Sequence, residues 1–259
     1  MHLSISSVLK YPQVYELDFI IRSYEVDFRG NLNPVVLCSM LQEIASSHAS
    51  SVSADITDLM KDNRTWMLSR LYVKIKRYPK WKDKIRIFTW PVGIHRLFAV
   101  RDFFIANEDG EIIAVSTSSW LVIDFKRRKP VRVDEYLKRM YLLPDIRAIN
   151  QLLDKPSFQS VELKEIGRDS VKLKDIDING HMTSMKYIEK VIDSFDEEIQ
   201  KKSVLTDILI YYNYEALLND GLIIKTGADD LSCSYLHKII RDKDNQELCV
   251  LKTEWSRVK

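Results

Sequence analysis

A chain of 259 residues is long enough for two domains of about 100 to 150 residues, each with its own hydrophobic core. Hydrophobic residues make up 46% of it and charged residues 29%, with only 7 Gly and 7 Pro, which is typical of a folded protein and excludes extended disorder. The formal net charge of +2 is too small to indicate a nucleic-acid partner, and no apolar run reaches the roughly 20 residues of a membrane-spanning helix.

The start of the chain and its cysteines indicate a reducing compartment. The first residues lack the apolar core and cleavage site of a signal peptide, so we expect a cytoplasmic protein. The cysteines are few and widely spaced, which predicts neither a disulfide framework nor a metal site, and we expect Cys38, Cys233 and Cys249 to be reduced and mostly buried. His95 and His237 also lack the spacing of metal ligands.

The first predicted helix begins near Asn33, a good N-cap, with Pro34 at its first position. Apolar side chains then recur at helical spacing, at Leu37, Met40, Leu41, Ile44, Ala45 and His48. On such a face a histidine is more often buried and structural than catalytic. Several strand-like segments follow with no second long helix, and this order predicts an antiparallel sheet.

The same plan recurs in the second half. Asp27-Phe-Arg-Gly-Asn-Leu-Asn33 and Asp177-Ile-Asn-Gly-His-Met-Thr183 both place Asp, then Gly three residues later, before a helix. The second helix carries its apolar side chains at Ile188, Val191, Ile192 and Phe195.

Strands and turns correspond as well. Residues 83–89 resemble residues 220–226, and the turns at 107–110 and 243–245 precede long strands that each end in a tryptophan, Trp120 or Trp255. One long helix wrapped by an antiparallel sheet, occurring twice, predicts an α+β fold of two tandem hot-dog domains. We expect them at 1–140 and 161–259, joined by a linker at 141–160. A single unrelated α+β domain is the alternative.

A polar cluster stands ahead of the second helix, at Asp175, Asp177, Asn179 and His181. If 175–179 is extended, the first three side chains share one face, and Gly180 allows the chain to turn. The helix N-terminus disfavours an imidazolium at His181, so that a neutral ring could accept a proton. The alternative is that Asp177 and Asn179 only make turn and cap hydrogen bonds.

Glu215 stands in an otherwise apolar and aromatic stretch, Tyr211–Leu217, where a carboxylate needs a partner or a function. If strand alternation continues through it, Glu215 faces opposite to Tyr212 and Tyr214. The repeat places Tyr78 near the equivalent point of the first half, so the fold itself requires no carboxylate there.

Nucleophilic catalysis by a side chain is not favoured. Cys38 falls in the first helix, Cys233 and Cys249 fall in strand-like segments, and none adjoins His181. Serine offers no G-x-S-x-G turn. The basic run Lys126–Lys129, after the strand that ends at Asp124, is either a docking site for an acidic protein or a solvated hairpin tip.

Several longer motifs occur in the order of one known family. They are Arg22–Val26, Leu41–His48, Tyr78–Asp83, Arg101-Asp102, Ser118–Val122, Arg127-Arg128, and Asp177–Met182 with Lys186-Tyr187, the last resembling the family's D-x-N-x-H segment. Through these motifs nearly the whole chain resembles the acyl carrier protein (ACP) thioesterases of bacteria and plants. The resemblance implies a tandem hot-dog fold, a fatty acyl chain linked through phosphopantetheine to ACP as substrate, free fatty acid as product, and no metal or organic cofactor.

The resemblance also implies site residues, all in the second domain. It carries Asp177, Asn179, His181 and Glu215 across as catalytic. Ala216 stands where plant members have a cysteine once proposed as nucleophile, so we expect attack by water. In that mechanism His181 and Glu215 deprotonate the water, Asn179 positions it or the thioester, and Asp177 holds the geometry or shares the acid–base work.

A second departure from the plant members is Thr183-Ser184, which replaces a pair of asparagines. We expect Arg127 and Arg128 to bind the carrier protein. The sequence leaves a homodimer open and predicts no nucleic-acid partner and no membrane span. The rival functions are a hot-dog acyl-CoA thioesterase and a non-catalytic acyl-binding module.

Overall fold

The computed structural model describes residues 5–133, 138, 140–150, 153–158, 161–229 and 233–258. The chain forms two compact units, Met1–Leu152 and Leu153–Lys259, each of which is described by itself. The predicted linker at 141–160 spans the division between them and stays a prediction. Of its residues, 151, 152, 159 and 160 lie outside the described ones.

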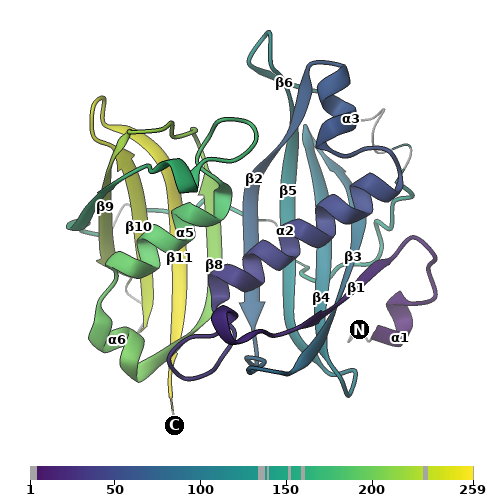
Figure 1. The fold of residues 1–259 in the computed structure, drawn as a ribbon, viewed down its shortest axis with the longest axis horizontal. Coiled ribbons are helices and arrows are strands. Elements are labelled where there is room, and N and C mark those ends of the chain that lie inside the picture. Colours follow the sequence, from purple (N-terminus) through teal and green to yellow (C-terminus); the bar gives the residue numbers. More distant parts are fainter. Residues whose placement is uncertain are drawn as a thin grey trace. The chain divides into compact units, whose positions relative to one another are not determined.

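Unit 1 is an antiparallel sheet with one long helix (Figure 1). The sheet has the strand order β1-β3-β4-β5-β2, with β6 paired to β5. The elements are α1 (Ile5–Val8), β1 (Tyr15–Ile20), η1 (Ser23–Glu25), α2 (Pro34–Ser51), α3 (Ile56–Lys61), β2 (Arg64–Ile75), β3 (Lys84–His95), β4 (Phe98–Asn107), β5 (Ile112–Asp124) and β6 (Lys129–Val131).

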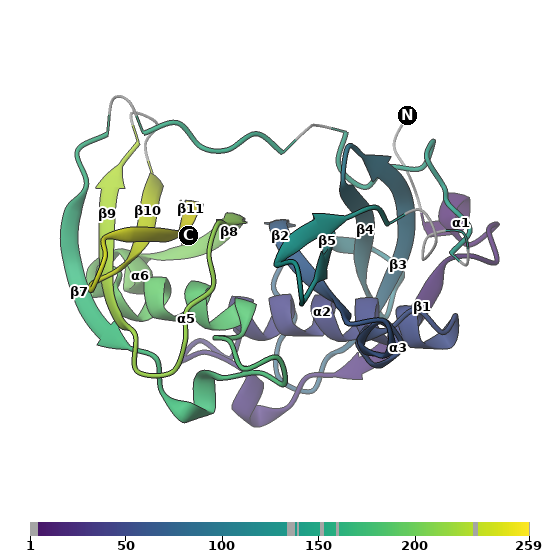
Figure 2. The same cartoon turned by 90° about the horizontal axis from the view of Figure 1, so that it is seen from above.

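Unit 2 repeats this architecture. Its antiparallel strand order is β8-β11-β10-β9-β7, and helix α5 packs on β7, β9 and β10, along one face of the sheet in Figure 2. The elements are β7 (Lys164–Ser170), η2 (Leu173–Asp175), α5 (Ser184–Ser194), α6 (Glu197–Lys202), β8 (Ser203–Tyr212), β9 (Gly221–Ala228), β10 (Ser234–Arg241) and β11 (Gln246–Arg257).

The two sheets correspond strand for strand, β1 to β7, β3 to β9, β4 to β10, β5 to β11 and β2 to β8. Each is paired with one long helix that follows a 3₁₀ turn. The α+β fold of two hot-dog domains is therefore confirmed. Strand β5 ends at Asp124 as predicted, but neither strand ends at its tryptophan: Trp120 lies within β5, and β11 continues past Trp255 to Arg257.

The long helices begin where the sequence predicts. In α2 the Asn33 side chain accepts the Val35 N–H at 2.8 Å, Pro34 is the first helical residue, and all six predicted core residues from Leu37 to His48 are buried. Full burial of a leucine or isoleucine stabilises a fold by about 1.5–3 kcal/mol, so this face fixes the helix on its sheet. In α5, Ile188 and Val191 are buried as predicted, and Phe195 is buried at the C-cap.

Candidate active site

The segment Asp177–His181 forms a closed turn. One Asp177 carboxylate oxygen, Oδ1, accepts the N–H groups of Asn179 at 2.8 Å and His181 at 3.3 Å. The Asp177 N–H donates to the His181 carbonyl at 2.9 Å, and the Gly180 N–H to the Asp177 carbonyl at 3.0 Å. Gly180 has φ +80°, a backbone conformation that glycine adopts without strain. The turn holds His181 just ahead of α5.

Residues 175–179 are thus not extended, and the expectation that Asp175, Asp177 and Asn179 share one face was wrong. Asp175 ends the 3₁₀ turn η2, and its buried carboxylate accepts the Lys172 N–H at 2.9 Å. It also pairs with Nζ of Lys190 on α5 at 3.3 Å. Burial alone would raise the pKa of Asp175, but the Lys172 N–H and the Lys190 ammonium lower it overall. Asp175 is therefore an ionised carboxylate that links the 3₁₀ turn η2 to helix α5.

Glu215 lies in a loop and not in a strand. Strand β8 ends at Tyr212, and the next two amides, of Asn213 and Tyr214, both donate to the Leu248 carbonyl, at 2.8 and 3.1 Å. One carbonyl that accepts two consecutive amides ends the regular pairing of the strands. The strand alternation expected through Glu215 was therefore wrong.

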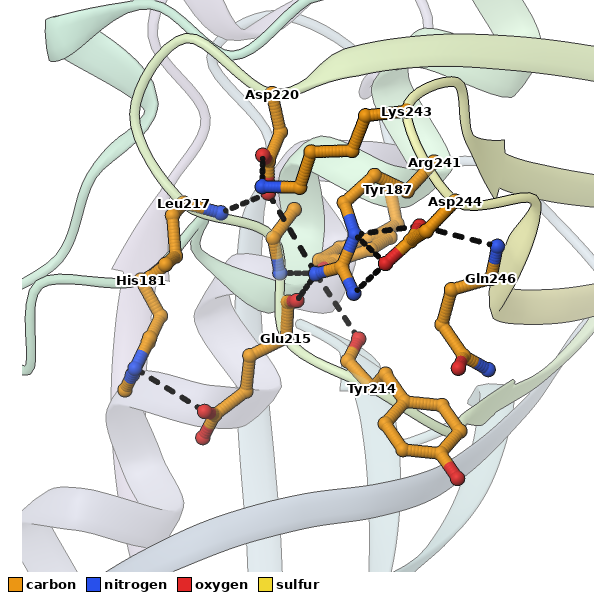
Figure 3. Close-up of polar contacts among 11 residues, drawn as sticks. His181, Tyr187, Tyr214, Glu215, Leu217, Asp220, Arg241, Lys243, Asp244 and Gln246 are labelled. Atoms are coloured by element: carbon orange, nitrogen blue, oxygen red, sulfur yellow. Dashed lines mark hydrogen bonds and ion pairs between the residues drawn. The ribbon is translucent and has the colours of Figure 1, made fainter.

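The loop brings Glu215 to the turn that carries His181 (Figure 3). Nε2 of His181 lies 3.1 Å from Oε2 of Glu215, and the side chains are 22% and 39% exposed. Met182, which follows His181, donates its N–H to the carbonyl of Ala216, which follows Glu215, at 2.9 Å. The backbone thus joins the two segments at the very point where the side chains meet.

This arrangement can perform acid–base chemistry. A carboxylate that accepts the Nε2–H of a neutral imidazole fixes the tautomer and leaves Nδ1 able to accept a proton. Asn179, half-buried in the same turn, supplies an amide group next to the pair in sequence. Three of the four predicted catalytic residues, Asp177, Asn179 and His181, share one turn, and the fold brings the fourth, Glu215, to it.

Two family models match the chain. The acyl-ACP thioesterase N-terminal domain matches residues 12–141, and the acyl-ACP thioesterase C-terminal domain matches residues 159–257. The chain belongs to the acyl-ACP thioesterase family. Both domains of the family are therefore present, and the His181–Glu215 pair lies in the C-terminal domain.

Individual acyl-ACP thioesterases agree with this assignment. Oleoyl-acyl carrier protein thioesterase 1, chloroplastic, of Arabidopsis thaliana is 26% identical over 240 residues, which cover 84% of this chain and 65% of that protein. Acyl-[acyl-carrier-protein] hydrolase FATB2, chloroplastic, of Cuphea viscosissima is 24% identical over 267 residues, 97% of this chain and 65% of that one. The chain thus spans less than two thirds of the length of these relatives.

Solved structures of acyl-ACP thioesterases share the fold. The crystal structure of an acyl-ACP thioesterase from Bacteroides thetaiotaomicron has a TM-score of 0.80 and 26% identity, and the match covers 94% of this chain and 98% of that one. The 12:0-ACP thioesterase from Umbellularia californica has a TM-score of 0.81 with 20% identity, covering 96% and 99% of the two chains. The second likeness shows the fold alone.

The positions of the three cysteines do not favour any of them as a catalytic nucleophile. Cys38 in α2 and Cys249 in β11 are buried, and burial raises the pKa of both thiols, that of Cys38 to about 12. Cys233 was expected in a strand but precedes β10, with φ 66°. All three are free thiols, as predicted. Among the described residues no cluster of His, Cys, Asp and Glu has the geometry of a metal site.

Arg127 and Arg128 lie in the exposed turn between β5 and β6 of unit 1. Asp124 holds this turn, since its Oδ1 accepts the Arg127 N–H at 2.9 Å and its carbonyl accepts the Arg128 N–H at 2.7 Å. The turn suits a docking site and a solvated hairpin tip equally. A role in binding the carrier protein stays a prediction.

Sequence reasoning missed the two contacts that hold the Glu215 loop: it named Tyr187 of α5 only within a family motif, and it did not name Arg241 at the end of β10. Tyr187 occupies a buried position of an amphipathic helix, where an aromatic residue normally indicates only packing. Arg241 precedes a hairpin turn, where a charged residue is ordinary. Neither position carries a local signal of its contact, because the contact is made across the fold.

Proposed function

We propose that this protein hydrolyses the thioester of fatty acyl-ACP and releases free fatty acid, by attack of water at a site in unit 2. The observation that carries the proposal is the 3.1 Å contact between His181 and Glu215 in a chain of the acyl-ACP thioesterase family. A hydrolase of this kind needs a base beside the scissile bond, and a paired carboxylate and imidazole supply one.

Each candidate residue has a part in this mechanism. His181 and Glu215 orient and deprotonate the water, a role worth typically about 10²- to 10⁴-fold in rate. Asn179 positions the water or the thioester. Asp177 keeps the turn closed, a role supported by the two N–H groups that it accepts.

The N-terminal amides of helix α5 can act on the carbonyl of the thioester. Its N-cap, Thr183, makes no side-chain hydrogen bond to the first turn, in contrast to Asn33 of α2. Amides at a helix N-terminus stabilise negative charge, so those of α5 can polarise the thioester carbonyl.

Water is the better nucleophile here than a cysteine. Ala216 cannot attack a thioester, and the buried thiols of Cys38 and Cys249 have raised pKa values that keep them protonated near neutral pH. The reaction then needs no covalent acyl-enzyme.

The experiment is a comparison of substrates. The purified protein should release free fatty acid from acyl-ACP, detected by mass spectrometry, faster than from CoA carrying the same acyl group. Faster hydrolysis of acyl-CoA would favour the rival acyl-CoA thioesterase. Tight acyl binding with no turnover on either carrier would favour a non-catalytic acyl-binding module.

The partner of this reaction is ACP carrying a phosphopantetheine-linked acyl chain. Among the described helices, none is long and apolar enough to cross a bilayer. A cytoplasmic location and a homodimer both stay predictions, and "chloroplastic" in the names of the plant relatives describes those proteins.

A further inference from the structure

The loop that carries Glu215 is held by contacts from outside it. Residues 213–220 between β8 and β9 contain no strand or helix, so no ladder of hydrogen bonds fixes the Glu215 backbone. A carboxylate on such a loop keeps its place beside His181 only if neighbouring elements hold the peptide groups around it.

Tyr187, on α5, binds the peptide groups on both sides of Glu215. Its hydroxyl oxygen accepts the Ala216 N–H at 3.0 Å, and the hydroxyl lies 3.5 Å from the Tyr214 carbonyl oxygen, to which it donates. The Tyr187 side chain is buried, and burial raises its pKa, so the phenol keeps its proton and can fill both roles.

Arg241, at the end of β10, binds the carbonyl of Glu215 itself, with Nη1 donating at 3.3 Å (Figure 3). The guanidinium is fixed by Asp244, to which Nε donates at 3.0 Å and Nη2 at 2.7 Å. Nη1 also lies 3.7 Å from Oδ2 of Asp220, which accepts the Leu217 N–H at 2.9 Å. The loop is therefore held by hydrogen bonds from Tyr187 of α5, from Arg241 of β10 and from Asp220 at the end of the loop itself.

Unit 1 shows which of these contacts the fold needs. There the Leu32 N–H donates to the Pro79 carbonyl at 2.8 Å, as Met182 does to Ala216, and Asp83 accepts the Lys80 N–H at 2.8 Å, as Asp220 accepts that of Leu217. These shared contacts place the loop in both units.

Among the described residues of unit 1, other residue types stand at the positions of Tyr187 and Arg241. Leu37, which has no hydroxyl, stands at the position of Tyr187, counted from the N-cap of the helix. Asn107 stands at the position of Arg241 and binds its own hairpin through Asp109 and Glu111. The tyrosine and arginine contacts thus occur in the unit that carries the carboxylate.

We propose that Tyr187 and Arg241 are positioning residues that hold Glu215 against His181. The inference rests on the proposed function, since it assigns the two residues to the same site. Neither touches the reacting atoms. Both act through the backbone of Glu215, and displacement of a catalytic group by about 1 Å can cost about 10²-fold in rate.

The kinetic test uses Arg241→Met and Tyr187→Phe, each of which removes the contact and keeps the size of the side chain. Each should lower kcat for acyl-ACP by about tenfold or more with KM little changed. In a Glu215→Gln background the same substitutions should cause less than about a threefold further loss, because residues that act through one group are not additive.

Arg168→Met is the matched control, since Arg168 is bound by Glu165 and Asp242 in the same unit. It should leave kcat within about twofold. Wild-type kcat in both Arg241→Met and Tyr187→Phe, or equal losses with and without Glu215, would overturn the proposal. If Arg241→Met does not fold, Tyr187→Phe tests the neighbouring peptide in the same way.

A spectroscopic readout separates this inference from the proposed function. The NMR signals of the His181 ring should move in Arg241→Met and Tyr187→Phe toward their positions in Glu215→Gln, and should stay in place in Arg168→Met. Ring signals that match wild type in both variants would overturn the positioning role. Wild-type protein that hydrolyses no acyl-ACP would refute the proposed function, while the ring signals would still decide whether the two residues hold Glu215.

Discussion

Asn31 of unit 1 and His181 of unit 2 occupy the same position in the same backbone turn. The Asn31 carbonyl accepts the Asp27 N–H at 2.7 Å, and Oδ1 of Asp27 accepts the amides of Arg29 and Asn31 at 2.8 and 3.0 Å. Asp177 makes the same set of bonds to Asn179 and His181. The aspartate therefore shapes a turn that the fold uses twice, and in unit 2 this turn carries His181, which we propose as catalytic.

The cysteines should be dispensable for turnover. Replacing Cys38, Cys233 and Cys249 together with Ala should leave kcat near wild type, because two of the thiols are buried and protonated and the residue after Glu215 is Ala216, which has no thiol. The measurement is kcat on acyl-ACP for protein shown to be folded by circular dichroism. A folded triple variant with kcat down about a thousandfold would restore a cysteine mechanism.

Charge reversal at Arg127 and Arg128 should raise KM for acyl-ACP more than KM for acyl-CoA, because the docking hypothesis makes this turn a contact of the carrier protein. The effect should shrink as salt rises, since exposed charges are screened beyond about 10 Å at 0.1 M. Arg77→Glu is the control. The turn with Arg127 and Arg128 follows Asp124, which pairs with Arg64 at the start of β2, whereas the exposed Arg77 lies just beyond the other end of β2. Equal changes for both substrates would remove this turn from the docking model.

The repeat, the antiparallel strands and the start of α2 could be predicted because local signals carry them. Asn33 and Pro34 mark a helix start, and apolar spacing marks its buried face. Tyr78 was also correctly predicted to be the equivalent of Glu215 in unit 1, because the residues that follow them, Pro79 and Ala216, accept equivalent backbone hydrogen bonds.

The local course of the site could not be predicted, because distant partners set it. Strand alternation failed at Glu215 because the Leu248 carbonyl takes two amides, and Leu248 lies on another strand. The Lys190 ammonium on α5 likewise binds the carboxylate of Asp175. The contacts of Leu248 and Lys190 have no signature within a short window of sequence. The turn closed by Asp177 is local, and it matches the alternative of turn hydrogen bonds at Asp177.

Lys190 should stabilise unit 2, because it binds Asp169 at 2.7 Å and the buried Asp175 at 3.3 Å. Lys190→Met introduces the residue that α2 has at the equivalent position, Met40, and should cost about 1–3 kcal/mol by leaving Asp175 without its ammonium. Urea denaturation measures this. Lys202→Met, at an exposed pair, should stay near wild type, and an equally small effect at Lys190 would contradict the role.

Two buried histidines should make stability depend on pH. Burial and the neighbouring Arg101 lower the pKa of His48 to about 3, and burial lowers that of His237 to about 3. The unfolded chain binds these protons below about pH 6.5 and the folded chain does not, so the contribution of these two residues to the free energy of unfolding is highest above pH 6.5. It should fall by about 1.4 kcal/mol per pH unit for each histidine as pH drops from 6.5 toward 3.

The check is urea denaturation at pH 7 and pH 5. His237→Gln should reduce the loss of stability between these values, and His95→Gln, at an exposed position, should not. An unchanged pH dependence in His237→Gln would show that this residue is not the proton acceptor on unfolding.

The His181–Glu215 pair is tested most directly by kcat on acyl-ACP for Glu215→Gln, His181→Ala and the double variant. Glu215→Gln keeps the shape and removes the carboxylate of the pair, so kcat should fall by about 10² or more while acyl binding and thermal stability change little. His181→Ala should be similarly damaging, and the double variant much less than additive if both groups act on one water. If Glu215→Gln keeps near-wild-type kcat at neutral pH while His181→Ala is inactive, Glu215 is structural and the pair is not the base.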